Sequence, residues 1–284
     1  MKITFFGTTT LLFDDGKTQI LFDAHFSRPS ILKMLFGKLR TDEVLVQSYL
    51  SQFSINRLSG IFVSHTHYDH VLDAPFVAKC TGAQIFGSVS ALNVARGGGI
   101  AEEKMHLFAQ KMPIQLGDFT VTPIQSLHSR AKWFNNDLGI EILEPLRQPQ
   151  PRRAYTEGGS WDFLVEHRDG QRFIIRPSFH FLPGELDFLA GKKVDALFLG
   201  IAGLARATPD FRRAFFAQTV EKARAKNVIP VHWDYFFRSL TKPVRPLPAL
   251  VDDIPRAFLQ LSEACQKNGS ALIVQIPFSS IYID

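Results

Sequence analysis

One short segment constrains this chain more than any other, because residues 64–70 read Ser-His-Thr-His-Tyr-Asp-His. It places three imidazoles and one carboxylate within six positions, at His65, His67, Asp69 and His70. Ionisable groups this close together are costly to bury unless a cation compensates them. The segment follows a short apolar run at residues 60–63 and precedes a helical pattern at residues 71–80. The pattern therefore predicts a metal site where a strand meets a helix.

The spacing within this segment favours two neighbouring ions rather than one. Imidazoles at alternate positions after a strand can converge on one ion, while Asp69 and His70 at the helix start face a second position. Zinc is the first candidate for both ions, with manganese and iron as alternatives. We expect two divalent metal ions.

The order of strand and helix patterns predicts two packed sheets. Short β-rich runs at residues 1–6, 9–13 and 19–23 open the chain as an antiparallel meander, and a long connection follows at residues 24–59. Further strands are predicted at residues 84–86, 105–108, 119–125, 161–167, 172–176, 196–199, 228–231 and 271–275, and further helices at about 209–226 and 254–267. Each half begins with strands and then alternates strands with helices. This order predicts an α/β fold with two sheets face to face and helices outside, in one domain over residues 1–284.

Composition narrows the class of protein. The chain is 45% apolar, its formal net charge is +5, and no apolar run approaches the roughly 20 residues that span a bilayer. No dense basic stripe marks a nucleic-acid surface, so nucleic acid is not an expected partner. Cys80 and Cys265 are too few for a disulfide framework, and the first residues resemble a strand rather than a signal peptide. We expect a cytoplasmic protein that acts on a small molecule.

The histidine motif resembles that of the metallo-β-lactamase superfamily, whose pattern is H-x-H-x-D-H. The resemblance extends along the chain: Asp23 closes an early strand, His128 follows a later strand, and His232 follows a strand near the C-terminus. It implies a four-layer αββα sandwich in which two sets of three residues hold the ions. The implied sets are His65, His67 and His128 for one ion, and Asp69, His70 and His232 for the other. Asp23 would support the histidine loop through hydrogen bonds.

Residues 194–197, 201–203 and 232–236 look most like the branch that contains ascorbate-phosphate lactonases and the phospholipase D that releases N-acylethanolamines. The chain departs from the superfamily at Ser178, which stands where an aspartate that bridges both metals is expected. A hydroxyl is a poor ligand at neutral pH, so the second ion should bind more weakly. His180, two positions further, is either a replacement ligand or proton donor, or an imidazole that lies at the surface or supports a ligand. His25 lies close enough to Asp23 to reach the mouth of the site.

The resemblance implies hydrolysis by a metal-bound hydroxide that Asp69 orients toward a carbonyl or phosphoryl centre. An ester, lactone or phosphodiester bond in an anionic or lipid-like small molecule is the expected target. The apolar stretch at residues 31–39 and the pair Trp133-Phe134 either flank the pocket or pack the loops down, and peripheral membrane contact stays open. A catalytically inert metal-binding sensor and a nucleic-acid processing nuclease are the alternatives.

Overall fold

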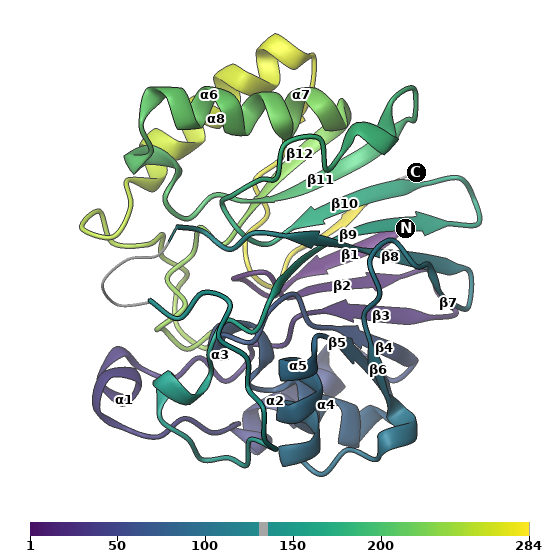
Figure 1. Cartoon of the computed structure of the whole chain (residues 1–284), viewed down its shortest axis with the longest axis vertical. Helices are drawn as coiled ribbons and strands as arrows, with labels where there is room; N and C mark the ends of the chain where they lie inside the picture. Colours follow the sequence, from purple (N-terminus) through teal and green to yellow (C-terminus); the bar gives the residue numbers. More distant parts are fainter. Residues whose placement is uncertain (131–135, 284) are drawn as a thin grey trace.

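Two seven-stranded sheets face each other in the computed structural model, which describes residues 1–130 and 136–283 (Figure 1). The strand order is β14-β1-β2-β3-β4-β5-β6 in the first sheet and β13-β12-β11-β10-β9-β8-β7 in the second. The first sheet consists of β1 (Lys2–Phe5), β2 (Leu11–Asp14), β3 (Gln19–Phe22), β4 (Leu58–Phe62), β5 (Gln84–Gly87), β6 (Met105–Leu107) and β14 (Ser280–Tyr282). The second consists of β7 (Ile114–Leu116), β8 (Phe119–Ser126), β9 (Ser160–His167), β10 (Arg172–Arg176), β11 (Val194–Gly200), β12 (Ala225–Val231) and β13 (Ala271–Leu272).

Helices cover the outer face of each sheet (Figure 1). On the side of the first sheet lie α1 (Ile31–Phe36), α2 (Glu43–Gln52), α3 (Tyr68–Val71), α4 (Ala74–Thr81) and α5 (Val89–Gly97). On the side of the second lie α6 (Pro209–Gln218), α7 (Val220–Ala223) and α8 (Ile254–Asn268). The predicted four-layer α/β sandwich is confirmed. No helix in the described part of the chain is long and apolar enough to cross a membrane.

Aromatic side chains fill the space between the sheets. Phe163 on β9 is fully buried, and its ring lies 5.1 Å from that of Phe22, 6.1 Å from that of Phe62 and 5.6 Å from that of Phe108. Phe22 and Phe62 belong to the first sheet and Phe163 to the second, so these contacts join the two layers. Much of the large phenylalanine content therefore serves the core between the sheets.

Strand direction brings the functional segments to one edge. The predicted antiparallel meander is present in β1, β2 and β3, after which β3, β4, β5 and β6 run parallel. In the second sheet β10, β11, β12 and β13 run parallel, and β9 is antiparallel to both β8 and β10. Asp23, His65, His128 and His232 each follow the carboxyl end of one of these strands. Ligands of open α/β sheets bind at such ends.

Some elements differ from their predicted bounds. The helix expected over residues 71–80 is divided into α3 and α4, because Pro75 has no N–H to continue the first helix and instead starts the second. The helix expected over 209–226 ends at Gln218, where Thr219 is its C-cap, and the short α7 follows. Arg224 then adopts a left-handed conformation that ends α7 before β12 begins. The long connection over residues 24–59 contains α1 and α2, and its last two residues already belong to β4.

Besides α1 and α2, three elements were missed, namely α5, β7 and β14, and one predicted strand is shorter than expected. Helix α5 ends at Gly97, in a stretch that the glycine run marked as a turn. The last predicted strand, over residues 271–275, is reduced to β13, and β14 was not foreseen. Strand β14 pairs with β1, about the whole length of the chain away, and local patterns contain no information about that partner.

Truncation of Phe163 tests the importance of the core between the sheets. We expect Phe163→Ala to lower the free energy of unfolding by about 3–5 kcal/mol, because the site is lined from both sheets and cannot collapse freely. Chemical denaturation measures the change. Leu259→Ala on the exposed face of α8 is the control and should change it by less than about 0.5 kcal/mol. Equal losses in both variants would contradict this account of the core.

Candidate metal centre

Backbone hydrogen bonds hold the loop after β4, which carries His65 and His67. The Ser64 backbone N–H donates to Asp23 Oδ1 at 2.8 Å, and the Thr66 N–H donates to the Glu157 carbonyl at 2.9 Å. His67 is the N-cap residue of α3, and Asp69 and His70 belong to this helix of four residues. Because the backbone of the loop is hydrogen-bonded on both sides, its imidazoles have little freedom to reorient.

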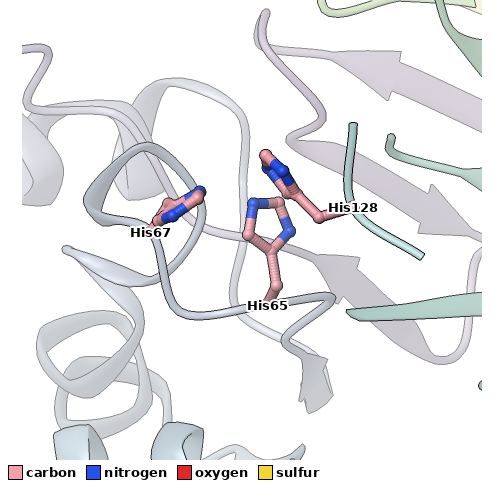
Figure 2. A group of neighbouring side chains, drawn as sticks. All are labelled: His65, His67 and His128. Carbon is pink, nitrogen blue, oxygen red and sulfur yellow. The ribbon is translucent and has the colours of Figure 1, made fainter. Parts of the chain in front are cut away.

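The first cluster contains His65, His67 and His128, and one ring nitrogen of each lies within 4.8 Å of those of the other two. Figure 2 shows the three imidazoles facing one another from two distant segments. The ring centroids of His128 lie 4.8 Å from those of His65 and 4.7 Å from those of His67. Three imidazole nitrogens are a typical ligand set for a catalytic zinc ion.

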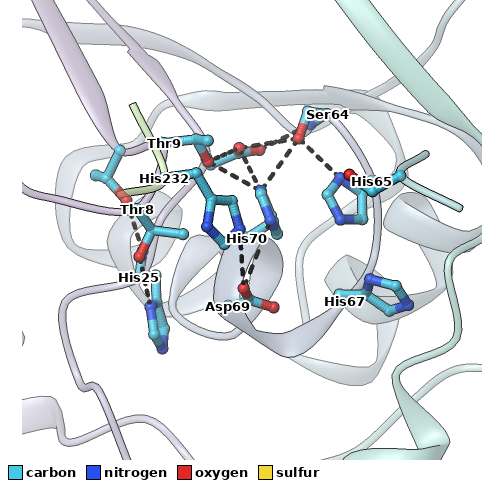
Figure 3. A network of polar contacts seen from close by, with 12 residues as sticks. Thr8, Thr9, His25, Ser64, His65, His67, Asp69, His70 and His232 are labelled. Carbon is cyan, nitrogen blue, oxygen red and sulfur yellow. Dashed lines mark hydrogen bonds and ion pairs between the residues drawn. The ribbon is translucent and has the colours of Figure 1, made fainter. Parts of the chain in front are cut away.

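The second cluster contains Asp69, His70 and His232, again with ligand atoms within 4.8 Å of one another. Asp69 Oδ2 lies 3.4 Å from His232 Nε2 and 3.7 Å from His70 Nε2 (Figure 3). The rings of His65 and His70 are only 3.8 Å apart, so the two clusters adjoin. The structure thus brings together all six residues that the sequence proposed as ligands.

The hydrogen bonds of the imidazoles fit a metal centre. Three of them use Nδ1 for a protein partner: His65 with Ser64 Oγ at 3.2 Å, His70 with Asp23 Oδ2 at 2.7 Å, and His128 with the Ser129 carbonyl at 2.9 Å. Their Nε2 atoms are left for another partner, and His65 Nε2 is buried with no hydrogen bond within the described residues. A buried nitrogen without a partner is costly, and a metal ion would satisfy it.

The electrostatics keep these groups in the protonation state that metal binding requires. Burial, reinforced by the neighbouring His67, lowers the pKa of His128 to about 3, and burial lowers that of His65 well below its usual value. Burial alone would raise the pKa of Asp69, but the adjacent His70 and His232 lower it below its usual value. Neutral imidazoles and an ionised carboxylate are the forms that bind metal ions.

Asp23 occupies the supporting position that the resemblance implied. Its carboxylate accepts hydrogen bonds from Thr9 Oγ1 and from Ser64, and it lies 2.7 Å from His70 Nδ1. Among the members of the two clusters it contacts His70, which belongs to the second. Thr9 and Ser64 were not foreseen, because hydroxyl residues in loops give no signal until their partners are known.

A second supporting carboxylate, Asp137, was also missed. Its two oxygens lie 3.3 and 3.2 Å from His67 Nε2, and this leaves His67 Nδ1 for the ion. Glu157 holds the segment in place, because its side chain accepts the Gly139 N–H at 2.9 Å while its carbonyl accepts the Thr66 N–H. Burial would raise the pKa of Asp137, but the hydrogen bond from His67 lowers it, so the carboxylate is ionised. A carboxylate on the outer nitrogen of a ligating histidine raises the basicity of that ligand.

The loop that carries His232 is tied to the turn between β1 and β2. His232 has a left-handed backbone (φ 60°), and its N–H donates to the Thr8 carbonyl at 2.6 Å. Asp234 accepts the Thr8 N–H at 2.7 Å and forms a buried ion pair with Arg28 at 2.7 Å. Gly7 is required in this turn, since a Cβ there would lie 1.8 Å from the Arg28 guanidinium.

Ser178 and His180 do not join either cluster. Ser178 is buried, and its loop is held by a hydrogen bond from the Phe179 N–H to Ser129 Oγ at 3.0 Å. The His180 ring packs against Phe181 and Phe211, and its Nδ1 accepts the Phe181 N–H at 2.9 Å. A role for His180 as ligand or proton donor stays a prediction that these contacts do not favour.

His25 lies beside the second cluster without belonging to it. It is fully buried, its Nδ1 is 3.5 Å from Thr8 Oγ1, and its ring packs edge-on against Tyr68. Burial lowers the pKa of His25 to about 3, so the ring is neutral. The pair Trp133-Phe134, expected near the pocket, lies outside the described residues.

A third group of possible ligands lies at the opposite end of the sandwich, away from the ends of β3 and β4. Its members are Asp15, Asp118 and His167. Lys17 and Arg168 pair with Asp118 at 3.6 and 3.7 Å, and His167 Nε2 lies 3.3 Å from Asp15. Its charges are therefore already compensated by protein groups, and it serves below as a control.

The loop that carries Ser178 begins at a buried ionic cluster. The guanidinium of Arg176 is fully buried and contacts the carboxyl groups of Glu185 and, at 3.2 Å, of Asp162. Burial raises the pKa of Asp162 above its usual value of 3.8, with the nearby Glu185 acting in the same direction and Arg176 opposing. The folded protein therefore keeps a proton that the unfolded chain releases, and this contribution to stability is lost as the pH rises above 3.8.

Replacement of Asp162 tests this linkage. In Asp162→Asn the side chain has no titrating carboxyl group. As the pH rises from about 4 to 7, the free energy of unfolding of this variant should therefore fall less than that of the wild type. Urea denaturation of both metal-free proteins at several pH values measures the two slopes. Parallel slopes would show that Asp162 does not take up a proton on folding.

The comparisons with known proteins agree with this geometry. A family model described as a β-lactamase superfamily domain matches residues 18–233. The chain belongs to this superfamily. The predicted metallo-β-lactamase relationship is thereby confirmed, while the narrower branch with the ascorbate-phosphate lactonases stays a prediction.

Individual relatives of this superfamily member are distant. A protein of Pyrobaculum islandicum named as a metal-dependent hydrolase is 28% identical over 242 residues, which is 83% of this chain and 85% of that one. A Heliobacterium modesticaldum protein with the same name is 30% identical over 105 residues, and the match spans only 37% of each chain. The structure resembles that of Igni18, described as a novel metallo hydrolase from Ignicoccus hospitalis, with a TM-score of 0.63, 16% identity and coverage of 99% and 97% of the two chains.

Replacement of Asp137 tests its proposed support of His67. We expect Asp137→Asn to weaken binding of the first ion by about 10- to 100-fold, because the uncharged amide makes His67 a poorer ligand. Competition with a chromophoric chelator measures the affinity. Asp118→Asn, in the third group, is the matched control and should leave the affinity unchanged. Equal affinity in the wild type and Asp137→Asn would contradict the supporting role.

Proposed function

We propose that the chain is a hydrolase that holds two divalent ions, with zinc as the first candidate and manganese or iron as alternatives. His65, His67 and His128 would hold one ion, and Asp69, His70 and His232 the other. One observation carries the proposal: the two clusters converge from three separate segments, and the buried Nε2 of His65 has no hydrogen-bond partner among the described residues. Superfamily membership and the names of the relatives support hydrolysis.

The ions would supply hydroxide at neutral pH, because a coordinated water has its pKa lowered to about 7. The protein supplies position and charge. Asp69 is the one carboxylate in the two clusters, and its ionised oxygen would accept a hydrogen bond from the attacking water and orient it. Asp23 and Asp137 hold His70 and His67 in place, so that little reorganisation is needed when substrate binds.

The charge of the site favours an anionic or phosphate-bearing substrate. With Ser178 in the place of a carboxylate, two divalent ions are opposed by Asp69 and one hydroxide, and a net charge of about +2 is left. Arg130 follows His128 by two residues and stacks on the ring of Phe211 at 4.5 Å, which adds positive charge nearby. We therefore propose an ester, lactone or phosphodiester bond in an anionic or lipid-like small molecule as the target.

A catalytically inert metal-binding sensor is the second candidate, and Ser178 is the observation that favours it. Without a bridging carboxylate the second ion binds less tightly, and a centre that loses one ion loses the assembled nucleophile. No feature of the described residues favours a nucleic-acid processing nuclease.

Elemental analysis combined with a substrate panel tests the proposal. We expect about two metal equivalents per chain and hydrolysis of at least one anionic ester, lactone or phosphodiester. Removal of metal with a chelator should abolish turnover, and added zinc should restore it. His128→Ala should lose about one equivalent and fall to the activity of the stripped protein, because the first ion keeps only two ligands.

Asp118→Asn is the control, since its carboxylate belongs to the third group, and it should keep both metal content and turnover. Metal at full occupancy without turnover on any substrate would favour the sensor. Turnover that survives complete metal removal would contradict both candidates.

A further inference from the structure

Helix α1 presents an apolar face to solvent. None of its six residues is buried, and Leu32, Leu35 and Phe36 are 67%, 55% and 85% exposed. Residues three and four positions apart share one face of a helix, so these three side chains form one continuous surface. Met34 contacts the core from the other side. Single exposed apolar residues are ordinary, but a helix that turns its apolar face outward needs a partner.

The charged residues that flank this face in the sequence are basic. Lys33, Lys38 and Arg40 are exposed, and residues 24–41 contain no aspartate or glutamate. The next acidic residues along the chain are Asp42, which caps α2, and Glu43, its first residue. An apolar face bordered by cations is the pattern of a helix that lies in the interface of an anionic membrane.

Hydrogen bonds at both ends of α1 and just beyond it hold the helix at the surface. Ser30 caps the N-terminus of the helix, because its side-chain oxygen accepts a hydrogen bond from the Lys33 N–H. At the other end the Gly37 N–H donates to the Lys33 carbonyl. Beyond the helix, Leu39 exchanges backbone hydrogen bonds of 2.6 and 3.1 Å with Gln150. The exposed face is therefore fixed at the surface.

The face lies at the same end of the molecule as the metal centre. Figure 1 shows α1 at the outer edge on the side where α3, which carries Asp69 and His70, also lies. The segment after Asp137, whose carboxylate contacts His67, adds exposed Ile140 and Leu143 to this end. A membrane in contact with α1 would lie near the entrance to the centre.

We propose that α1 docks the protein on anionic lipid bilayers. Leu32, Leu35 and Phe36 enter the boundary between headgroups and acyl chains, while Lys33 and Lys38 contact the lipid phosphates. The docking does not depend on the proposed hydrolysis, because it needs neither metal nor substrate.

A bilayer fits this surface better than a protein partner does. A stable protein interface buries about 800 Å² on each partner, more than a two-turn helix supplies. In a symmetric dimer through α1, the same basic residues of both copies would face each other and repel. A bilayer requires no complementary shape, and its anionic headgroups match the charge.

Vesicle flotation in the presence of a chelator tests the proposal. We expect the wild type to bind phosphatidylcholine vesicles with a quarter phosphatidylserine at least about tenfold more strongly than pure phosphatidylcholine vesicles. Leu35→Ser/Phe36→Ser removes apolar area without a change in charge, and it should weaken binding to the anionic vesicles by about tenfold or more. Leu259→Ser, which removes an equally exposed leucine from α8 in the other helical layer, should bind like the wild type.

Two further measurements separate insertion from other effects. Both serine variants should unfold at the wild-type temperature, because α1 and Leu259 bury little. Tryptophan at the docking face, in Phe36→Trp, should shift its emission to shorter wavelength when anionic vesicles are added, relative to the wild type.

Three results would overturn the proposal. The wild type could fail to float with anionic vesicles. Leu35→Ser/Phe36→Ser could bind as strongly as the wild type, which would show that a basic chain adsorbs by charge alone. Light scattering could show a wild-type dimer that the double variant disperses, which would make the face a contact between copies of this chain.

Discussion

The arrangement of the two clusters depends on the hydrogen bonds of the Asp23 carboxylate. This carboxylate joins the turn after β1 through Thr9, the histidine loop through Ser64, and α3 through His70. The backbone around it is strained, since Thr8, Asp23 and His232 all have φ between 51° and 60°. Each such residue costs about 1–3 kcal/mol, and the hydrogen bonds of the carboxylate help to offset this cost. Strain of this kind is typical of sites whose side chains must be held in one arrangement.

The two sheets make that arrangement possible. Their shared core of phenylalanines keeps the strand ends of both sheets at a constant separation, so that His65 from the first sheet and His128 from the second face each other. Burial of the centre then keeps His65 and His128 neutral. The same low-polarity surroundings strengthen the interaction of any bound cation with Asp69. The core therefore determines both the geometry of the centre and its electrostatics.

The centre and the surface of α1 suggest a division of tasks. In the proposed scheme the buried clusters would provide the chemistry, while the exposed connection between β3 and β4 would contact a membrane. The connection begins directly after Asp23, so one segment links the metal centre to the proposed membrane contact. A lipid-like substrate would be consistent with both features.

Local sequence patterns were sufficient for the meander of β1 to β3, for the four layers and for the position of the histidine loop between a strand and a helix. These features depend on periodicity and on spacings of a few residues, which the covalent chain imposes wherever the segment lies. The division of the helix at Pro75 also had a local signal, but one that apolar periodicity obscured. Strand β14 had none, because its pairing with β1 depends on contacts across the whole chain.

By itself the sequence determined that three imidazoles and a carboxylate lie close together in the segment that follows one strand. Only the tertiary structure decided which groups would meet them. Asp137 is 70 residues from His67 in the chain, and the side chain of Glu157 holds the backbone next to Asp137 through the Gly139 N–H. The orientation of His180 toward Phe211 and the outward face of α1 were likewise decided by packing. Such contacts result from the balance of burial and loop closure over the entire fold, and residue spacing does not encode that balance.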